Sequence, residues 1–316
     1  MKKAIQWGII GLLALQISCS SSSNETADGP TFGEITVAVD ESFIPLIDSQ
    51  AESFESMYKR AKVNIVGAEE GKAINLMLEG NARIAIVSRE LNEEELAIFE
   101  KLKIKQRVLK IAEDGLAIIL HPSNPDTLLT MAQLEKIAKG ETRKWKDVSG
   151  KGNNLDINLV FDKGSSSNYN FFQKKFNLPQ DPDSFVFAAG SNVAVIDYVK
   201  KNPNAIGVVG VGWISDKDDT TQLSFRKGIT VASIAAKDTS SDGYFQPYQA
   251  YLAQKVYPLS RDILILSREA RVGLGTGFSA FIAADRGQRI FLKAGLLPAT
   301  MPIRLIQTTK KSPYDK

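Results

Sequence analysis

The chain reads Phe161-Asp162-Lys163-Gly164-Ser165-Ser166-Ser167-Asn168-Tyr169 where an apolar strand gives way to a helix with periodic apolar positions. Residues 157–161 alternate and include β-branched side chains, a pattern typical of a strand. After the serines, Tyr169, Phe172 and Phe176 recur at helical spacing. The three serines therefore fall at the predicted N-terminus of a helix.

This serine loop, residues 164–168, has the chemistry of an anion site. The first backbone N–H groups of a helix lack intrahelical partners, and the helix dipole places partial positive charge on them. Serine hydroxyls add further donors, so an oxyanion can be held there without a metal ion. A serine that only caps a surface helix has the same local sequence. The rest of the chain has to decide between these two interpretations.

The composition describes a globular chain with a large core and nearly balanced charge. The 316 residues are 43% hydrophobic and 24% charged, and the formal net charge is +3. Runs of Lys and Arg never exceed two residues. A surface that tracks phosphodiesters therefore has no support, and we exclude a nucleic-acid partner.

The N-terminus has the organisation of an export signal. Two lysines precede an apolar run, residues 5–17, that is too short to span a bilayer comfortably. Cys19, the single cysteine of the chain, follows this run, which excludes a disulfide framework. An apolar run that ends in a small residue and a cysteine resembles the signal of bacterial lipoproteins. We therefore expect a lipoprotein signal peptide over residues 1–19, a flexible tether over residues 20–33, and an exported protein, periplasmic or at the cell surface, anchored through Cys19.

Predicted strands and helices alternate after the tether. Residues 35–39, 64–66 and 84–87 have the apolar patterns of strands, and each is followed by a helical pattern. Residues 67–71 are predicted as the turn between the second strand and its helix. Such alternation predicts a mostly parallel sheet with helices on its faces. Ligands in such sheets bind at the carboxyl ends of strands, where Ser42, Ser88 and the serine loop all fall. This coincidence favours a ligand site over an ordinary helix cap.

Two proline-marked segments, residues 121–125 and 257–258, predict connectors between two lobes. A chain that leaves one lobe through one connector and returns through another forms discontinuous domains. We expect one lobe from residues 34–120 plus 257–316 and the other from residues 121–256.

Catalysis has little support in the residues. The only histidine, His121, lies in the first connector, so the commonest general base and metal ligand is absent from the predicted site. A serine nucleophile needs a positioned base, and the serine loop contains no Gly-x-Ser-x-Gly elbow. We expect neither an enzyme, nor a cofactor, nor a metal site.

With these segments placed, the chain resembles the phosphate-binding component of bacterial ABC phosphate importers. That family has a two-lobed type II periplasmic-binding-protein fold, in which each lobe is an α/β unit with a mostly parallel sheet and the ligand cleft lies between the lobes. The resemblance covers nearly everything after the tether, and its motifs are specific only jointly and in order. They lie at residues 40–43, 86–89, 113–119, 124–125, 134–146, 161–169, 204–207, 257–261 and 285–295.

The resemblance implies that two lobes close on one oxyanion through hydroxyls, backbone N–H groups and usually a buried Arg and a carboxylate. The implied ligands in this chain are Ser42, Phe43 (through its backbone N–H), Ser88, Arg89, Ser165, Ser166, Ser167 and Asn168. Asn168 stands where an arginine often follows this loop in the family, and Phe161 stands where some members carry a phosphate-binding arginine. One guanidinium is therefore missing, and Arg89 is left to supply the charge. The carboxylate that accepts the proton of hydrogen phosphate is Asp40, Glu41 or Asp162.

The leading hypothesis is a surface-tethered, monomeric solute-binding protein that captures inorganic phosphate for the transmembrane subunits of an ABC permease. The alternative is a sensor or binding module of the same fold for another anion, such as sulfate, a metal oxyanion or a small organic anion. Titration of the domain with phosphate, sulfate and tungstate separates the two.

Overall fold

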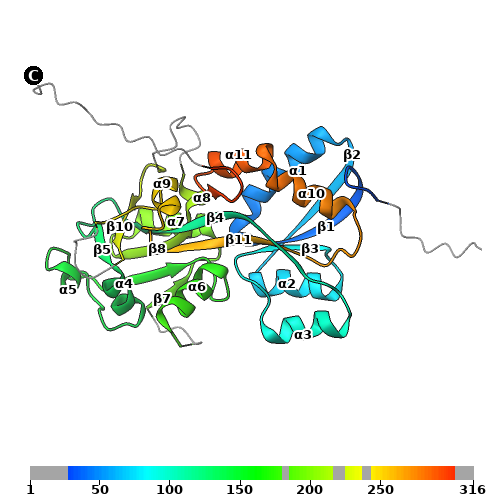
Figure 1. Ribbon diagram of the computed structural model, residues 1–316. Helices are drawn as coiled ribbons and strands as arrows, with labels where there is room; N and C mark the ends of the chain where they lie inside the picture. The colour runs from blue at the N-terminus through cyan, green and yellow to red at the C-terminus, as the bar shows by residue number, and fades with distance from the viewer. Residues whose placement is uncertain (1–27, 180–184, 216–224, 237–242, 303–316) are drawn as a thin grey trace, which may run out of the picture.

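The computed structural model describes residues 28–179, 185–215, 225–236 and 243–302. Cys19 and the predicted signal peptide lie outside these ranges. Figure 1 shows two groups of strands and helices, joined in the middle of the molecule by two long strands, β4 (Arg107–Leu120) and β11 (Ser260–Ser267).

The strands form one path of hydrogen-bonded neighbours in the order β2-β1-β3-β11-β4-β8-β6-β7, with β9 and β12 also paired to β4. The runs β2-β1-β3 and β8-β6-β7 are parallel, as the alternation of strands and helices predicts. Strands β11 and β4 run antiparallel to their neighbours on this path. The remaining bounds are β1 (Phe32–Asp40), β2 (Arg60–Ala68), β3 (Ile84–Val87), β6 (Asn158–Phe161), β7 (Val186–Ala188), β8 (Ala205–Gly210), β9 (Thr230–Val231), β12 (Leu297–Pro298), and the separate pair β5 (Leu128–Thr130) and β10 (Ser233–Ala235).

Helices cover both faces of the half that contains β1 (Figure 1). One face carries α1 (Ile44–Met57), α10 (Leu274–Ala283) and α11 (Asp285–Lys293), and the other carries α2 (Glu70–Glu79) and α3 (Glu93–Lys101). The alternation in β1 explains this arrangement, because Val37 packs into the core beneath α1 while Ala38 packs into the core beneath α2. The result is a buried sheet whose strand ends are free to hold a ligand.

The other half follows the same plan. Helices α4 (Met131–Ala138) and α6 (Ser167–Phe176) lie on one face of β6 and β8, and α7 (Asn192–Lys201) lies on the opposite face. The ring of Phe161 lies 5.3 Å from that of Phe172, so the aromatic stripe seen in the sequence fixes α6 to its strand. Short helices complete the structure: η2 (Glu41–Phe43), α5 (Lys146–Ser149), α8 (Val211–Ile214) and α9 (Gln249–Ala253).

The chain crosses from one half to the other inside β4. This strand pairs with β11 as far as Gly115 and with β8 from Leu116 onward. The predicted lobe boundary at residue 120 and the connector at residues 121–125 therefore lie beyond the crossing. A continuous apolar strand gives no local signal of the point where its partner changes.

Candidate functional site

The cleft between the two halves is the candidate ligand site. It has a volume of about 810 Å³ and is lined by the loop after β3, the start of α2, α6 and β11. Two of these segments follow the carboxyl ends of β2 and β3, and α6 follows β6 from the other half. The lining residues are Glu70, Ser88, Arg89, Glu90, Ser167, Asn170, Phe171, Lys174, Lys175, Ser260, Arg261, Asp262 and Leu264.

Ser42 and Ser167 meet between the two halves. Ser42 lies in η2 directly after β1, and Ser167 is the first residue of α6. Their Oγ atoms are 3.1 Å apart, and both residues are buried. Trp213 Nε1, from α8, also donates to the carbonyl oxygen of Ser42 at 2.8 Å. The N-terminal segments η2 and α6, which follow β1 and β6, therefore meet between the two halves.

Arg261 brings a buried positive charge to this pair. Its Nη1 donates to Ser167 Oγ at 3.0 Å, and its Nε and Nη2 donate to Asp114 Oδ2 at 3.1 and 3.0 Å. The residue is 5% exposed, and its guanidinium carbon lies 4.9 Å from the centroid of the Phe43 ring. A guanidinium that touches a serine at a helix N-terminus is well placed to bind an oxyanion.

Sequence reasoning missed Arg261 as a site residue. Residues 257–261 form one of the family-like motifs, but the sequence predicts only the connector at residues 257–258 and leaves Arg89 to supply the charge. The available signal was the position of Arg261, because this arginine follows a predicted connector directly and a connector borders the cleft.

Asp40 is a buried carboxylate beside the two serines. Its Oδ1 accepts the N–H of Ser42 at 2.8 Å, and its Oδ2 is buried without a hydrogen-bond partner among the described residues. Burial raises the pKa of Asp40 to about 6, although the positive charge of Arg261 opposes the rise; the negative charge of Glu70 adds to it. The site thus contains an unpaired acceptor.

The other two carboxylates that the sequence left open are engaged elsewhere. Glu41 forms an ion pair with Lys163, with 2.7 Å between Lys163 Nζ and Glu41 Oε2. Asp162 accepts hydrogen bonds from the Asn168 and Asn192 side chains, at 3.2 and 3.3 Å. Of these three carboxylates, Asp40 alone has a buried oxygen without a hydrogen-bond partner among the described residues.

Ser88 and Arg89 lie on the wall of the cleft, where acidic side chains engage both. Ser88 donates to Glu70 Oε1 through its N–H at 2.8 Å and its Oγ at 2.6 Å. Arg89 donates to both carboxylate oxygens of Glu95 at 2.7 and 2.8 Å, and its side chain is 37% exposed. Much of the charge predicted for Arg89 is therefore balanced by Glu95. Glu70 is a second residue that sequence reasoning missed, since its segment was predicted only as a turn.

The other residues of the serine loop do not line the cleft. Ser166 caps α6, because its Oγ accepts the N–H of Tyr169 at 3.2 Å. Asn168 is fully buried and bonds to Asp162 within its own half. Ser165 is exposed at the loop. The structure therefore groups Ser42, Phe43 and Ser167 around Arg261 and leaves these three predicted ligands outside that group.

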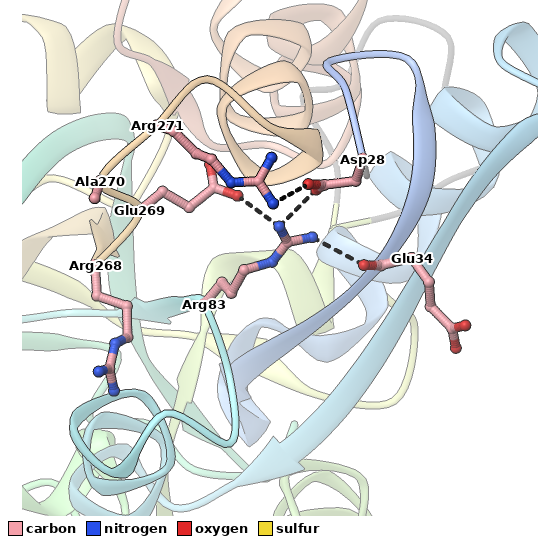
Figure 2. A pocket seen from close by; sticks show the side chains of 7 residues that line it. All are labelled: Asp28, Glu34, Arg83, Arg268, Glu269, Ala270 and Arg271. Carbon is pink, nitrogen blue, oxygen red and sulfur yellow. Dashed lines mark hydrogen bonds and ion pairs between the residues drawn. The ribbon is translucent and has the colours of Figure 1, made fainter. Parts of the chain in front are cut away.

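A second pocket, of about 550 Å³, is a cluster of ion pairs near the start of the described chain. Figure 2 shows Arg83 and Arg271 pointing toward Asp28. Arg83 Nη1 lies 2.5 Å from Asp28 Oδ2 and 3.2 Å from Glu269 Oε1, and Asp28 also accepts the N–H of Leu274 at 2.9 Å. The predicted tether extended to residue 33, but these contacts fix the chain to the fold from Asp28 onward. We assign this pocket a structural role.

Two further observations on the described ranges concern membrane-spanning helices and metal sites. None of their helices combines the length and apolar composition needed to cross a membrane. Nor do these ranges bring three or more His, Cys, Asp or Glu side chains together in a way that could hold a metal ion.

Comparison with known proteins identifies the family to which the chain is similar. A family model described as a PBP superfamily domain matches residues 24–286. The chain is 26% identical over 304 residues to the phosphate-binding protein PstS of Staphylococcus epidermidis, covering 91% of this chain and 87% of that protein. It is 24% identical over 298 residues to PstS of Staphylococcus aureus, covering 91% and 86% of the two chains.

Solved structures share the two-lobed fold. One is described as a phosphate ABC transporter substrate-binding protein with bound phosphate from Clostridium perfringens; the TM-score is 0.72 at 23% identity, over 84% of this chain and 100% of that one. Another is an ABC-type phosphate transport receptor from Vibrio cholerae, with a TM-score of 0.65 at 26% identity, over 85% and 100% of the two chains. The likeness extends over both halves of the structure.

Proposed function

The chain belongs to the PBP superfamily, and from that premise we propose that it is a solute-binding protein that captures inorganic phosphate for an ABC importer. Its relatives are binding proteins, and the proposed function needs no catalytic step. The cleft takes up the anion, and the loaded protein delivers it to the transmembrane subunits of a permease.

One observation carries this proposal. The hydroxyls of Ser42 and Ser167, from two different halves of the molecule, lie 3.1 Å apart, and Arg261 donates to Ser167 at 3.0 Å. At that spacing the two hydroxyls can donate to a single oxygen or to two oxygens of one tetrahedral anion. A ligand bound there would contact both halves at once and hold them together.

The electrostatics of the group suit an oxyanion. The N-termini of α1 and α6 add backbone N–H groups and partial positive charge at the same place. Hydrogen bonds to a charged group contribute about 1.5–3 kcal/mol each, against about 1 kcal/mol for neutral pairs. We therefore propose Arg261 as the main cationic ligand, with Ser42, Phe43 and Ser167 as its partners.

Ser88 and Arg89 remain proposed ligands at the wall of the cleft. Both face the same volume as Arg261, and a shift of Glu95 would free the Arg89 guanidinium for an anion. We propose weaker roles for Ser165, Ser166 and Asn168, which act by shaping the loop and capping α6.

Asp40 supports phosphate over sulfate. Its buried Oδ2 lacks a partner among the described residues, so it can accept the proton of a protonated oxyanion. Fully ionised sulfate has no proton to give, and two acceptors facing each other leave buried lone pairs unpaired. A binding module for sulfate or another fully ionised anion is the second candidate, and Asp40 argues against it.

The remaining parts of the proposal concern location and architecture. We propose that the two lobes comprise residues 34–120 with 257–316 and residues 121–256, with the first crossing adjusted to Gly115. The protein is proposed to be exported, lipidated at Cys19 and monomeric. The support is the arrangement of the N-terminal signal, and the proposal is tested by fractionation of a Cys19 variant.

Calorimetric titration of the chain without residues 1–19 tests the function. We expect phosphate to bind at neutral pH at least about tenfold more tightly than sulfate or tungstate, because an unpaired buried acceptor opposes the fully ionised anions. Tighter binding of sulfate or tungstate would make the second candidate the better one. No heat with any of the three anions would exclude oxyanion capture.

A further inference from the structure

Glu70 places a carboxylate where the N-terminus of α2 faces the cleft. It is the first residue of the helix, it is 2% exposed, and it lines the cleft together with Ser167 and Arg261. Ser88 fixes it through two hydrogen bonds to Oε1, at 2.8 and 2.6 Å. A helix N-terminus would by itself attract an anion. Here the protein's own carboxylate occupies that position.

The ligand site therefore contains negative as well as positive side chains. Glu70 lines the cleft, whereas Asp40 lies behind its lining, bonded to Ser42, whose hydroxyl contacts the lining residue Ser167. Both carboxylates are buried, and the charge of Glu70 contributes to the raised pKa of Asp40, so the two interact.

The one buried cation at the site is Arg261, which already forms an ion pair with buried Asp114. The other cations that line the cleft, Arg89, Lys174 and Lys175, are partly or fully exposed, so solvent screens their charges. A doubly charged anion would therefore meet two buried carboxylates and one buried guanidinium that is already shared, and this arrangement disfavours it.

Acid protons on the ligand would remove the repulsion between the anion and the two carboxylates. Each proton lets a ligand oxygen donate to a carboxylate instead of repelling it. A tetrahedral monoanion with two acid protons can donate to both Asp40 and Glu70 while its remaining oxygens accept from Ser42, Ser167 and Arg261. Hydrogen phosphate carries one proton and satisfies only one of the two carboxylates.

We infer that Glu70 is a specificity-determining residue that, together with Asp40, restricts the cleft to the monoanionic, doubly protonated form of a tetrahedral oxyanion, as in dihydrogen phosphate or dihydrogen arsenate. This inference rests on the proposed function, since it names the protonation state of the ligand at the same site. Phosphate capture is then strongest in mildly acidic surroundings and weakens as the dianion takes over.

Charged and titratable side chains from several elements surround Asp40 and Glu70. Arg89 lies 3.7 Å from Glu70 Oε2 through its Nε and is itself paired with Glu95. The charged and titratable groups concerned are Arg261 and Asp262 from β11, Asp114 from β4, Arg89 and Glu90 after β3, Glu95 from α3, and Lys174 and Lys175 from α6.

The test is a calorimetric titration of the full chain, purified in detergent, with inorganic phosphate at pH 6 and pH 8. For the parent protein we expect the affinity for total phosphate to fall about three- to fivefold between these values, because the monoanion gives way to the dianion while about half of Asp40 is still protonated at pH 6. Glu70→Gln keeps the shape and an oxygen for the Ser88 donors but removes the charge. We expect its affinities at the two pH values to agree within about twofold, because the dianion is now admitted. Glu69→Gln is the matched control, since it makes the same change at the neighbouring position, which does not line the cleft.

A second variant extends the test to sulfate. Glu70→Gln alone is expected to reject sulfate, because Asp40 still faces the ligand, whereas the double variant Asp40→Asn/Glu70→Gln is expected to bind it. The inference is overturned if the parent binds phosphate equally well at pH 6 and pH 8. It is also overturned if the affinity of Glu70→Gln falls between these pH values by as much as that of the parent. Either result leaves phosphate capture intact. A parent that binds no phosphate at either pH overturns the proposed function instead. The parent's own profile decides even if a variant fails to fold.

Discussion

Arg261 and Asp114 stand directly opposite each other on β11 and β4, at the point where the chain passes from one half of the protein to the other. Their side chains are 2% and 3% exposed, and Arg261 donates two hydrogen bonds to Asp114 Oδ2. Burial raises the pKa of Asp114, although the charge and hydrogen bonds of Arg261 oppose the rise. The same guanidinium touches Ser167. The proposed ligand site and the crossing between the lobes therefore share one residue.

Arg261→Ala is the first prediction. Loss of the guanidinium should weaken phosphate binding by about ten- to a hundredfold, since a charged hydrogen bond is lost. It should also lower the free energy of unfolding by about 3–5 kcal/mol, because Asp114 is left buried without its partner. Calorimetry measures the change in affinity, and urea unfolding measures the change in stability. Arg261→Lys separates the two effects, because lysine keeps the positive charge but lacks the planar set of N–H donors of the guanidinium.

Arg89→Ala is the matched control for that experiment. Arg89 is partly exposed and paired with Glu95, so its removal should change the free energy of unfolding by less than about 1 kcal/mol. Its effect on phosphate affinity should be smaller than that of Arg261→Ala. If Arg89→Ala weakens binding more, the main cationic role belongs to Arg89, as the sequence first indicated.

A double-mutant cycle on Ser42 and Ser167 is the second prediction. Each alanine variant should weaken phosphate binding by about fivefold, the equivalent of one neutral hydrogen bond. The double variant should lose less than the product of the two, because the hydroxyls contact each other and share the ligand. Ser165→Ala, at an exposed position in the same loop, should weaken binding by less than about twofold, in keeping with its weaker proposed role. Strictly multiplicative losses would show that the two hydroxyls contribute independently to phosphate binding.

Local sequence patterns predicted the strand ends well but not the long-range partners. The alternation before Ser42 and the aromatic stripe after Ser167 are local, and periodicity detects them. Arg261 lies 94 positions from Ser167 and 147 from Asp114, and no local pattern encodes which residues meet across strands. The fold and the positions of the serines after their strands were therefore predictable, whereas the buried position of Arg261 beside Ser167 needed the structure.

Glu70 shows a second limit of the sequence. Acidic residues near a predicted turn are usually solvated, and residue 70 lies beside residue 69 in such a segment. Its burial arises because Ser88, at the end of another strand, donates two hydrogen bonds to it. That pairing depends on how β2 and β3 are arranged around β1, which only the assembled sheet determines.

Cys19→Ser is the third prediction and concerns the membrane anchor. If Cys19 is lipidated, the variant should move from the membrane fraction to the soluble fraction, because acyl chains supply the membrane affinity. The described helices offer no alternative span. Ser20→Ala is the control and should remain at the membrane. A Cys19→Ser protein that stays in the membrane fraction with residues 1–19 uncleaved would show that the signal is an ordinary anchor.

Asp40→Asn is the last prediction and turns on the sign of a pKa shift. The folded protein raises the pKa of Asp40 from 3.8 to about 6, so between these values the native state binds more protons than the unfolded state. The contribution of Asp40 to stability is therefore present at low pH and is lost as the pH rises through about 6. Ionised Asp40 then destabilises the fold by up to about 3 kcal/mol, from 1.36 kcal/mol for each pKa unit.

The asparagine variant removes this penalty while keeping an oxygen for the Ser42 N–H. In ligand-free protein we expect Asp40→Asn to be more stable than the parent at pH 8, with the difference shrinking toward zero near pH 4. Urea unfolding at pH 4, 6 and 8 measures it. Phosphate affinity should fall at the same time, since the variant loses an acceptor for the ligand proton. If the variant is less stable than the parent at pH 8, the ionised carboxylate stabilises the fold. Asp40 would then be a structural cap of η2 and not an acceptor for the ligand proton.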